Sequence, residues 1–186
     1  MRIIAGKHKG LALAALGKGD AGAHLRPTSD RVRESLFNLL LNGGYGDPVT
    51  GARVLDLFAG TGALGLEALS RGAVHVTFVD DGVKARSLIR ENVEKCRAQG
   101  VSKLYRRDAT RLGENRGTPF SLVFLDPPYG KKLGEKALAA ALAGGWLADD
   151  ALVVWEENTA QDVPEGFVRL DSRQYGDTAI TILRRG

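Results

Sequence analysis

The sequence predicts an α/β fold built on an open, mostly parallel β-sheet. Between residues 53 and 156, short apolar segments of strand length alternate with longer segments in which apolar residues recur at helical spacing. This alternation is typical of strand–helix–strand units, in which helices cover both faces of the sheet. Glycines follow the first strand and acidic residues follow later ones, at the edge where such sheets bind ligands.

The elements follow one another in a regular order along the chain. The predicted strands are residues 53–58, 74–79, 101–106, 120–125 and 151–156. The predicted helices between them are residues 63–71, 83–99 and 134–143. Two further stretches, residues 167–174 and 178–183, are separated by a turn at residues 176–177. They predict a closing β-hairpin that adds an antiparallel strand.

The first 45 residues precede this pattern and predict an extension to the α/β domain of residues 46–186. Short apolar runs at residues 3–5 and 11–16 favour a small hairpin, followed by a glycine-rich loop at residues 17–23. Pro-Thr-Ser-Asp at residues 27–30 is typical of a helix start. Apolar residues then recur at helical spacing and predict a helix of about three turns.

Positive charge is concentrated in this extension. Residues 1–33 contain seven Lys or Arg residues and two acids, whereas the rest of the chain contains 19 and 20. Such an asymmetry indicates either an arm that meets a polyanion, because Lys and Arg displace counterions from phosphates, or a solvated basic face. The charge alone leaves both open.

Composition points to an ordinary globular protein. The chain is 44% hydrophobic and 26% charged, and its only cysteine, Cys96, cannot form an internal disulfide. The N-terminus lacks the apolar stretch of a secretory signal, and no segment is apolar enough to span a membrane. The scattered histidines suggest no metal site. We expect a cytoplasmic, monomeric protein with no membrane or metal partner.

The glycine loop indicates a nucleotide-like ligand. Gly60, Gly62 and Gly65 match the pattern G-x-G-x-x-G between the first strand and its helix, and Asp80 ends the next strand. A dinucleotide or a ligand-free tight turn also fits this pattern. Asp56 favours another ligand, because its carboxylate near the loop floor would repel a pyrophosphate. S-adenosylmethionine instead carries a cationic ammonium and a cationic sulfonium.

Two more acids complete the predicted cofactor site. Asp80 suits the ribose hydroxyls, and Asp108, just past the third strand, suits the adenine amino group. The predicted cofactor-binding residues are Asp56, Phe58, Ala59, Gly60, Thr61, Gly62, Asp80, Asp108 and Ala109.

A second motif follows the fourth strand. Asp126, Pro127, Pro128 and Tyr129 form a DPPY tetrad, whose prolines fix the backbone and present carbonyl oxygens. The Asp126 carboxylate and the Pro127 carbonyl can each accept a hydrogen from an amino group on a base, which orients its lone pair toward a methyl donor. Tyr129 offers a stacking surface for a base splayed out of its helix. An ordinary Pro-Pro turn is the alternative interpretation.

The two motifs together resemble the class I, Rossmann-like amino methyltransferases. More narrowly, the chain resembles the RsmD family over nearly its whole length. The matching segments are residues 2–6 (RIIAG), 25–38 (LRPTSDRVRESLFN), 56–70 (DLFAGTGALGLEALS) and 145–147 (GWL). The resemblance implies a seven-stranded sheet with one reversed strand and an RNA-facing N-terminal hairpin. It also implies transfer of a methyl group to guanine N2 in 16S ribosomal RNA of the small subunit or its assembly intermediate.

The resemblance further implies that basic residues of the extension meet the RNA. The candidates are Lys7, Lys9, Arg26, Arg31 and Arg33. The arginines fit salt bridges on a helix surface as an alternative, and the lysines fit a hairpin that is kept soluble. Gly82 departs from the family pattern, since an acid often follows the second strand there, and the loop at residues 17–23 is unusually long.

Three other functions remain open from the sequence. A DNA adenine-N6 methyltransferase uses the same tetrad, but it usually needs a target-recognition region for which the chain has little room. A protein amide methyltransferase leaves the basic extension unexplained. A non-catalytic RNA-binding module leaves the intact glycine loop, acids and tetrad unexplained.

Overall fold

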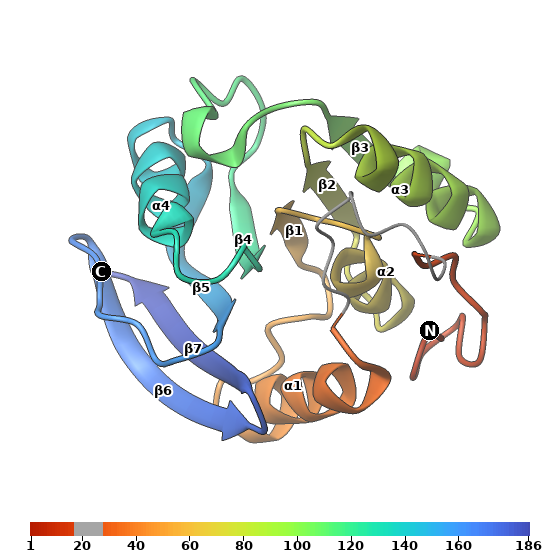
Figure 1. The fold of residues 1–186 in the computed structure, drawn as a ribbon, viewed down its shortest axis with the longest axis horizontal. Helices are drawn as coiled ribbons and strands as arrows, with labels where there is room; N and C mark the ends of the chain where they lie inside the picture. Colours follow the sequence, from red (N-terminus) through yellow and green to blue (C-terminus); the bar gives the residue numbers. More distant parts are fainter. Residues whose placement is uncertain (17–27) are drawn as a thin grey trace.

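The fold is one seven-stranded sheet with helices on both faces (Figure 1). The computed structural model describes residues 1–16 and 28–186. The strands lie in the order β3-β2-β1-β4-β5-β7-β6, and β1 to β5 run parallel to one another. β7 runs antiparallel to both β5 and β6. The predicted α/β class, with seven strands of which one is reversed, is confirmed.

The elements agree with the predicted order. The strands are β1 (Arg53–Leu57), β2 (His75–Val79), β3 (Ser102–Tyr105), β4 (Phe120–Leu125), β5 (Leu147–Glu157), β6 (Phe167–Tyr175) and β7 (Thr178–Arg185). The α-helices are α1 (Asp30–Asn42), α2 (Ala63–Ser70), α3 (Val83–Lys95) and α4 (Leu133–Ala143). Within residues 1–16 and 28–186, short 3-10 helices are formed at η2 (Gln99–Val101) and η3 (Ala109–Arg111).

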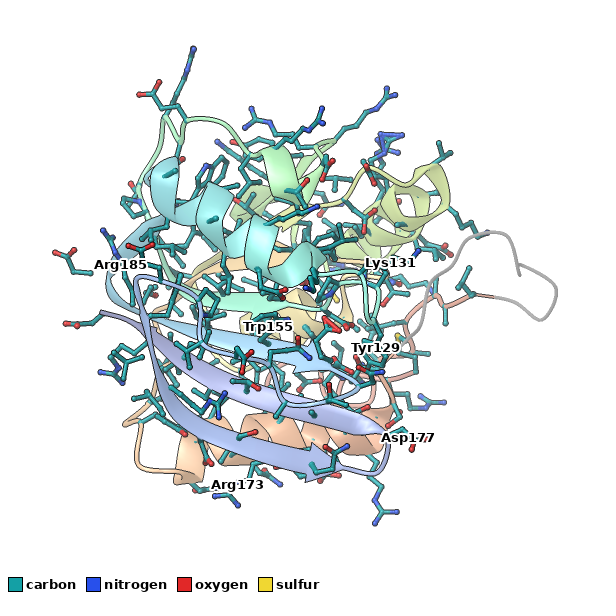
Figure 2. The ribbon with its side chains drawn as sticks, turned by 60° about the vertical axis from the view of Figure 1, so that its left-hand side comes forward. Tyr129, Lys131, Trp155, Arg173, Asp177 and Arg185 are labelled. Carbon is teal, nitrogen blue, oxygen red and sulfur yellow. The ribbon has the colours of Figure 1, made fainter. Side chains whose placement is uncertain are left out.

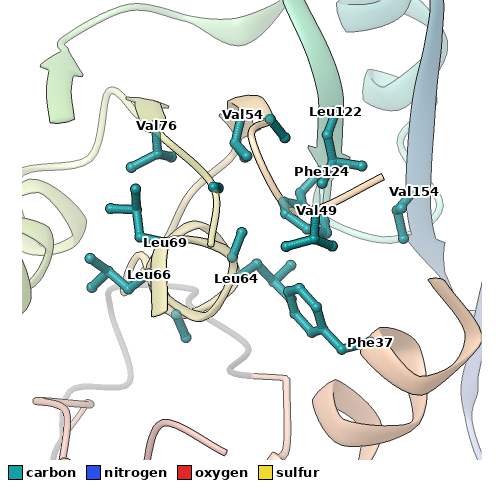
Figure 3. Packing of buried hydrophobic residues seen from close by; sticks show 14 of the residues in the cluster. Phe37, Val49, Val54, Leu64, Leu66, Leu69, Val76, Leu122, Phe124 and Val154 are labelled. Atoms are coloured by element: carbon teal, nitrogen blue, oxygen red, sulfur yellow. The ribbon is translucent and has the colours of Figure 1, made fainter. Parts of the chain in front are cut away.

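The central strands are buried because their side chains alternate between two apolar clusters. In β1, Val54 belongs to the first cluster and Leu55 to the second. The first cluster packs under α1, α2 and α3, and Figure 3 shows Phe37 of α1 beside the sheet. The ring centroids of Phe37 and Phe124 are 5.6 Å apart. The second cluster contains Leu138 of α4. Burial on both faces accounts for the near-continuous apolar strands in the sequence.

Two predicted boundaries are wrong for local reasons. The helix predicted over residues 83–99 ends at Lys95, because Cys96 caps it and Arg97 adopts a left-handed φ of 51°. The strand predicted over residues 151–156 begins earlier, at Leu147, which pairs with Phe120 before the register shifts. Asp150, with a φ of 59°, lies within this irregular stretch.

The N-terminal extension is anchored on α2. Its predicted hairpin is confirmed only as a single antiparallel bridge between Arg2 and Ala12. At its turn, Gly6 has a φ of 85°, and a Cβ there would lie 1.9 Å from the Ser70 carbonyl oxygen. Glycine is therefore required at position 6. The predicted loop at residues 17–23 lies outside the described residues.

The predicted helix after this extension is α1. Ser29 caps it and accepts a hydrogen bond from the Val32 amide at 3.2 Å, as the capping cluster in the sequence predicts. Within residues 1–16 and 28–186, no helix is both long and apolar enough to cross a membrane.

Candidate functional site

A cavity of about 580 Å³ opens at the carboxyl ends of β1, β2, β3 and β4. Its lining contains all of the predicted cofactor-binding residues except Gly62, and it also contains Asp126 and Pro128 of the tetrad. The structure therefore brings the glycine loop and the DPPY tetrad to one cavity, at the edge of the sheet where open α/β folds bind ligands.

The glycine loop needs its glycines for two different reasons. Gly60 and Gly62 have positive φ values of 61° and 80°, and Gly62 turns the chain into α2. Gly65 instead allows close packing, since a Cβ there would lie 2.7 Å from the side chains of both Phe78 and Val76. Gly62 thus shapes the loop from its buried side rather than lining the cavity.

Asp56 lies beneath this loop. Its side chain is 1% exposed, and Oδ2 accepts a hydrogen bond from the Gly65 amide at 3.1 Å. Burial raises the pKa of Asp56 well above its usual range, and the nearby Asp80 raises it further, against the Gly65 hydrogen bond. A cationic ligand in the cavity would favour the ionised form of this carboxylate.

Asp80 links the glycine loop to the turn after β2. Its Oδ2 accepts from the Gly60 amide at 3.0 Å, and its Oδ1 accepts from the Gly82 amide at 2.9 Å. Burial raises the pKa of Asp80 despite these two hydrogen bonds. A carboxylate has about four lone-pair sites, so acceptors remain for two hydroxyl groups. Gly82 allows the close approach, since a Cβ there would lie 3.2 Å from Asp80 Oδ1.

Asp108 is an exposed residue of the cavity lining and the N-cap of η3. Its Oδ1 accepts from the Thr110 amide at 2.9 Å and from the Thr110 hydroxyl at 2.7 Å. These hydrogen bonds lower the pKa of Asp108, so that it is ionised near neutral pH. The next residue, Ala109, is buried and lines the cavity.

The tetrad follows β4 directly. The Asp126 amide donates to the Leu57 carbonyl at 3.4 Å, which continues the contact between β4 and β1. Pro127 is buried, whereas Tyr129 is half-buried. Tyr129 and Lys131 lie on the loop between β4 and α4 (Figure 2). The two central strands thus hold the tetrad where Asp126 and Pro128 line the cavity.

Sequence reasoning missed two residues beside the tetrad. Thr28 lines the cavity, and its Oγ1 donates to Glu156 Oε2 at 2.8 Å and lies 3.4 Å from Asp126 Oδ2. Glu156 is 3% exposed at the end of β5. The sequence does indicate Glu156, because it is an acidic residue at the end of an apolar strand, as Asp80 is. Thr28 gives no such signal, because it looks like part of a helix cap.

The basic candidates of the extension separate into different environments. Lys7, Lys9 and Arg31 are exposed. The two lysines line a second hollow of about 550 Å³ together with Lys95 and Arg97 at the end of α3. We call these four residues the basic groove. Arg26 lies outside the described residues.

The prediction that Arg33 contacts RNA is wrong. Its side chain is 0% exposed and points from α1 into the protein. There it pairs with Asp30 at 2.9 Å and with Glu67 at 3.6 Å, and it donates to the Arg2 carbonyl. The side chain therefore joins α1, α2 and the N-terminal extension, because a buried guanidinium needs charged and polar partners.

The described residues contain no group of three or more His, Cys, Asp or Glu side chains arranged to hold a metal ion.

Comparisons with known proteins agree with this geometry. Residues 1–184 match the family model described as conserved hypothetical protein 95. The chain is 36% identical to ribosomal RNA small subunit methyltransferase D of Escherichia coli K12, over 100% of this chain and 90% of that protein. It is also 36% identical to the protein of the same name from Haemophilus influenzae, over 95% and 89%.

A solved structure has the same fold. The Escherichia coli protein yhhF superposes with a TM-score of 0.82 at 35% identity, over 100% of this chain and 97% of that chain. The Rossmann-like methyltransferase fold is therefore confirmed, and S-adenosylmethionine is the cofactor predicted for its cavity. The chain belongs to the family described as conserved hypothetical protein 95, which is the RsmD family that its motifs predict.

Proposed function

We propose that this protein transfers a methyl group from S-adenosylmethionine to the N2 amino group of a guanine in 16S ribosomal RNA of the small subunit. The observation that carries the proposal is that Asp126 and Pro128 of the tetrad line the same cavity as the glycine loop. Support for the RNA comes from the relatives named ribosomal RNA small subunit methyltransferase D.

The residues of the cavity fit the cofactor. Asp56 is buried where a cationic ammonium or sulfonium group offsets its charge, and Asp80 has lone pairs left for ribose hydroxyls. Asp108 lines the cavity next to Ala109 and offers an acceptor for an adenine amino group. When bound, S-adenosylmethionine supplies an electrophilic methyl group next to the tetrad.

The tetrad orients the acceptor. An exocyclic amine is a poor nucleophile, because its lone pair is delocalised into the ring. The Asp126 carboxylate and the Pro127 carbonyl accept its two hydrogens and direct the lone pair toward the methyl group, so the main contribution is orientation. Tyr129 stacks on the base after it leaves its helix.

The basic groove supplies a distant anchor for the RNA. Val83 and Lys84, at the start of α3, line the cavity, whereas Lys95 and Arg97 at its end line the groove. Twelve residue steps of α-helix separate Val83 from Lys95, which is about 18 Å. Exposed cations at that distance bind phosphates that flank the target without reading its sequence. Arg31 adds another exposed cation on α1.

Methyl transfer to three acceptors tests the proposal. Radiolabelled S-adenosylmethionine is incubated with the protein and with small ribosomal subunits from a strain lacking it, protein-free ribosomal RNA, or duplex DNA. We expect label in N2-methylguanosine from subunits or RNA. Label in N6-methyladenine from DNA would retain the chemistry of the tetrad and overturn the acceptor. Absence of label from all three, with the cofactor bound, would overturn the nucleic-acid substrate.

A further inference from the structure

β5 ends in two buried acids beside the tetrad. Glu156 and Glu157 are each 3% exposed, and consecutive residues of a strand point to opposite faces of the sheet. Glu157 Oε1 accepts from the Gly130 amide at 3.3 Å, just after the tetrad. Because Trp155 pairs with Leu125, Glu156 lies next to Asp126 across the strands. The end of β5 therefore contacts the tetrad loop from both faces.

Thr28 connects Glu156 to Asp126. Its Oγ1 lies 2.8 Å from Glu156 Oε2 and 3.4 Å from Asp126 Oδ2. A hydroxyl has one proton to donate, and the shorter contact takes it. The lone pairs of Oγ1 are then left to face Asp126. Three oxygen-bearing side chains thus form a row from the cavity into the protein interior, in the order Asp126, Thr28 and Glu156.

Methylation of an amine releases a proton, and this row of side chains can receive it. When the nitrogen forms its bond to the methyl carbon, the methyl–sulfur bond breaks and its electron pair stays on sulfur. The nitrogen must also lose a proton to give the neutral product. Asp126, which accepts a hydrogen bond from that amine in the proposed function, is the base within reach. A protonated Asp126 can donate to Thr28 Oγ1, and Thr28 can donate its own proton to Glu156 over the shorter contact of 2.8 Å.

We propose that Thr28 and Glu156 are positioning residues that act through Asp126. Thr28 Oγ1 lies between the two carboxyl groups, where it can accept a hydrogen bond from a protonated Asp126 and donate one to Glu156. As the amine proton moves to Asp126, a proton shifts from Asp126 to Thr28 and from Thr28 to Glu156. This inference rests on the proposed function, and it goes beyond it by assigning a route for the released proton.

Four variants test the row by its effect on rate. Thr28→Val removes the hydroxyl at nearly constant volume, and Thr28→Ser retains it. Glu156→Gln removes the buried charge, and Glu165→Gln removes an exposed carboxylate from the loop that follows β5. In single turnovers on ribosomal RNA, Thr28→Val and Glu156→Gln should lower the rate of transfer on the order of 10²-fold, with KM for RNA unchanged. Thr28→Ser should restore most of the rate, and Glu165→Gln should not change it.

Two further readouts separate positioning from a structural role. Calorimetry should give the same affinity for S-adenosylmethionine in all four variants. Titration of ¹³C-labelled aspartate carboxyls by NMR, with the Asp126 signal assigned from Asp126→Asn, should show a lower midpoint for Asp126 in Glu156→Gln, because a neighbouring like charge is removed. Asp56 on β1 and Lys84 on α3 line the same cavity and are unchanged in this comparison.

The outcomes distinguish this inference from the proposed function. Wild-type rates in both Thr28→Val and Glu156→Gln, with N2-methylguanosine formed, would overturn the proton route and leave the function intact. An Asp126 midpoint that does not respond to Glu156→Gln would also overturn it. If no guanine is methylated by the wild-type protein but the midpoint responds, the acceptor is wrong and the coupling of the three side chains stands.

Discussion

The two ends of α3 hold charge in different ways. Near its start, Asp56 is buried and Asp80 is half-buried, and their oxygens accept hydrogen bonds from backbone amides of the glycine loop and of Gly82. At its end, Lys7, Lys9 and Lys95 are exposed in the basic groove. A charge fixed by backbone hydrogen bonds acts at one atom of one ligand, whereas exposed charges act through their summed field. Substitutions in the cavity should therefore have large, separate effects, and those in the groove should have graded effects that depend on salt.

The largest effect is expected at Asp126. Asp126→Asn keeps the size of the side chain but removes the negative charge that accepts the amine hydrogen. We expect the rate of methyl transfer to fall on the order of 10³-fold, with the affinity for S-adenosylmethionine nearly unchanged. Radiolabel transfer and calorimetry measure the two quantities separately. A parallel loss of cofactor affinity would move Asp126 from acceptor orientation to cofactor binding.

The next largest effect is a loss of stability, expected at one of two arginines on α1 and not at the other. Arg33→Gln breaks a buried ion pair and leaves Glu67 with less compensation, which should lower the free energy of unfolding by about 3 kcal/mol. Arg31→Gln, two residues away and exposed, should change it by less than about 0.5 kcal/mol. Denaturant titration measures both. Equal destabilisation by the two substitutions would contradict the buried position of Arg33.

Asp56 predicts a pH dependence with a definite sign. Because its pKa is raised in the folded protein, its contribution to stability is fully present below the usual carboxyl range and is lost as the pH rises through the raised pKa. A cationic ligand favours the ionised form, so binding of S-adenosylmethionine should release a proton in that range. Calorimetry in two buffers with different ionisation enthalpies measures this release. Asp56→Asn should abolish it; a release that persists in this variant would have to come from another group, such as Asp80.

The smallest effect is expected in the basic groove. Replacing Lys7 and Lys9 with glutamine should reduce the slope of log affinity for RNA against log salt by about 0.7 to 0.9 for each phosphate that the lysines no longer neutralise. Filter binding at several salt concentrations measures the slope. Lys136→Gln, an exposed lysine on α4, is the matched control and should leave the slope unchanged. An unchanged slope in the double variant would remove the two lysines from the RNA interface.

The sequence predicts the cavity better than its surroundings. Gly60, Gly62 and Asp80 stand at fixed distances from strand ends, and backbone geometry between neighbouring elements then determines where they lie. The predicted order of strands and helices is confirmed for the same reason. These features depend on contacts between elements that are close in the chain.

Features that depend on distant contacts could not be predicted in this way. Arg33 looks like a surface cation in its own helix, and only the approach of Glu67 from α2 explains its burial. The role of Thr28 as a bridge likewise depends on Glu156, which lies 128 residues later. The predicted end of α3 is wrong because Arg97, which adopts the left-handed conformation there, is not the glycine that would mark such a position in a sequence.

One measurement tests the central claim that the tetrad and the glycine loop form a single site for guanine methylation. A strain lacking the protein is complemented with the wild-type protein or with Asp126→Asn. Small-subunit ribosomal RNA from each complemented strain is digested, and its nucleosides are measured by mass spectrometry. Wild-type protein should restore a missing N2-methylguanosine, and Asp126→Asn, expressed at the same level, should not. Restoration by both proteins, or by neither, would contradict the claim.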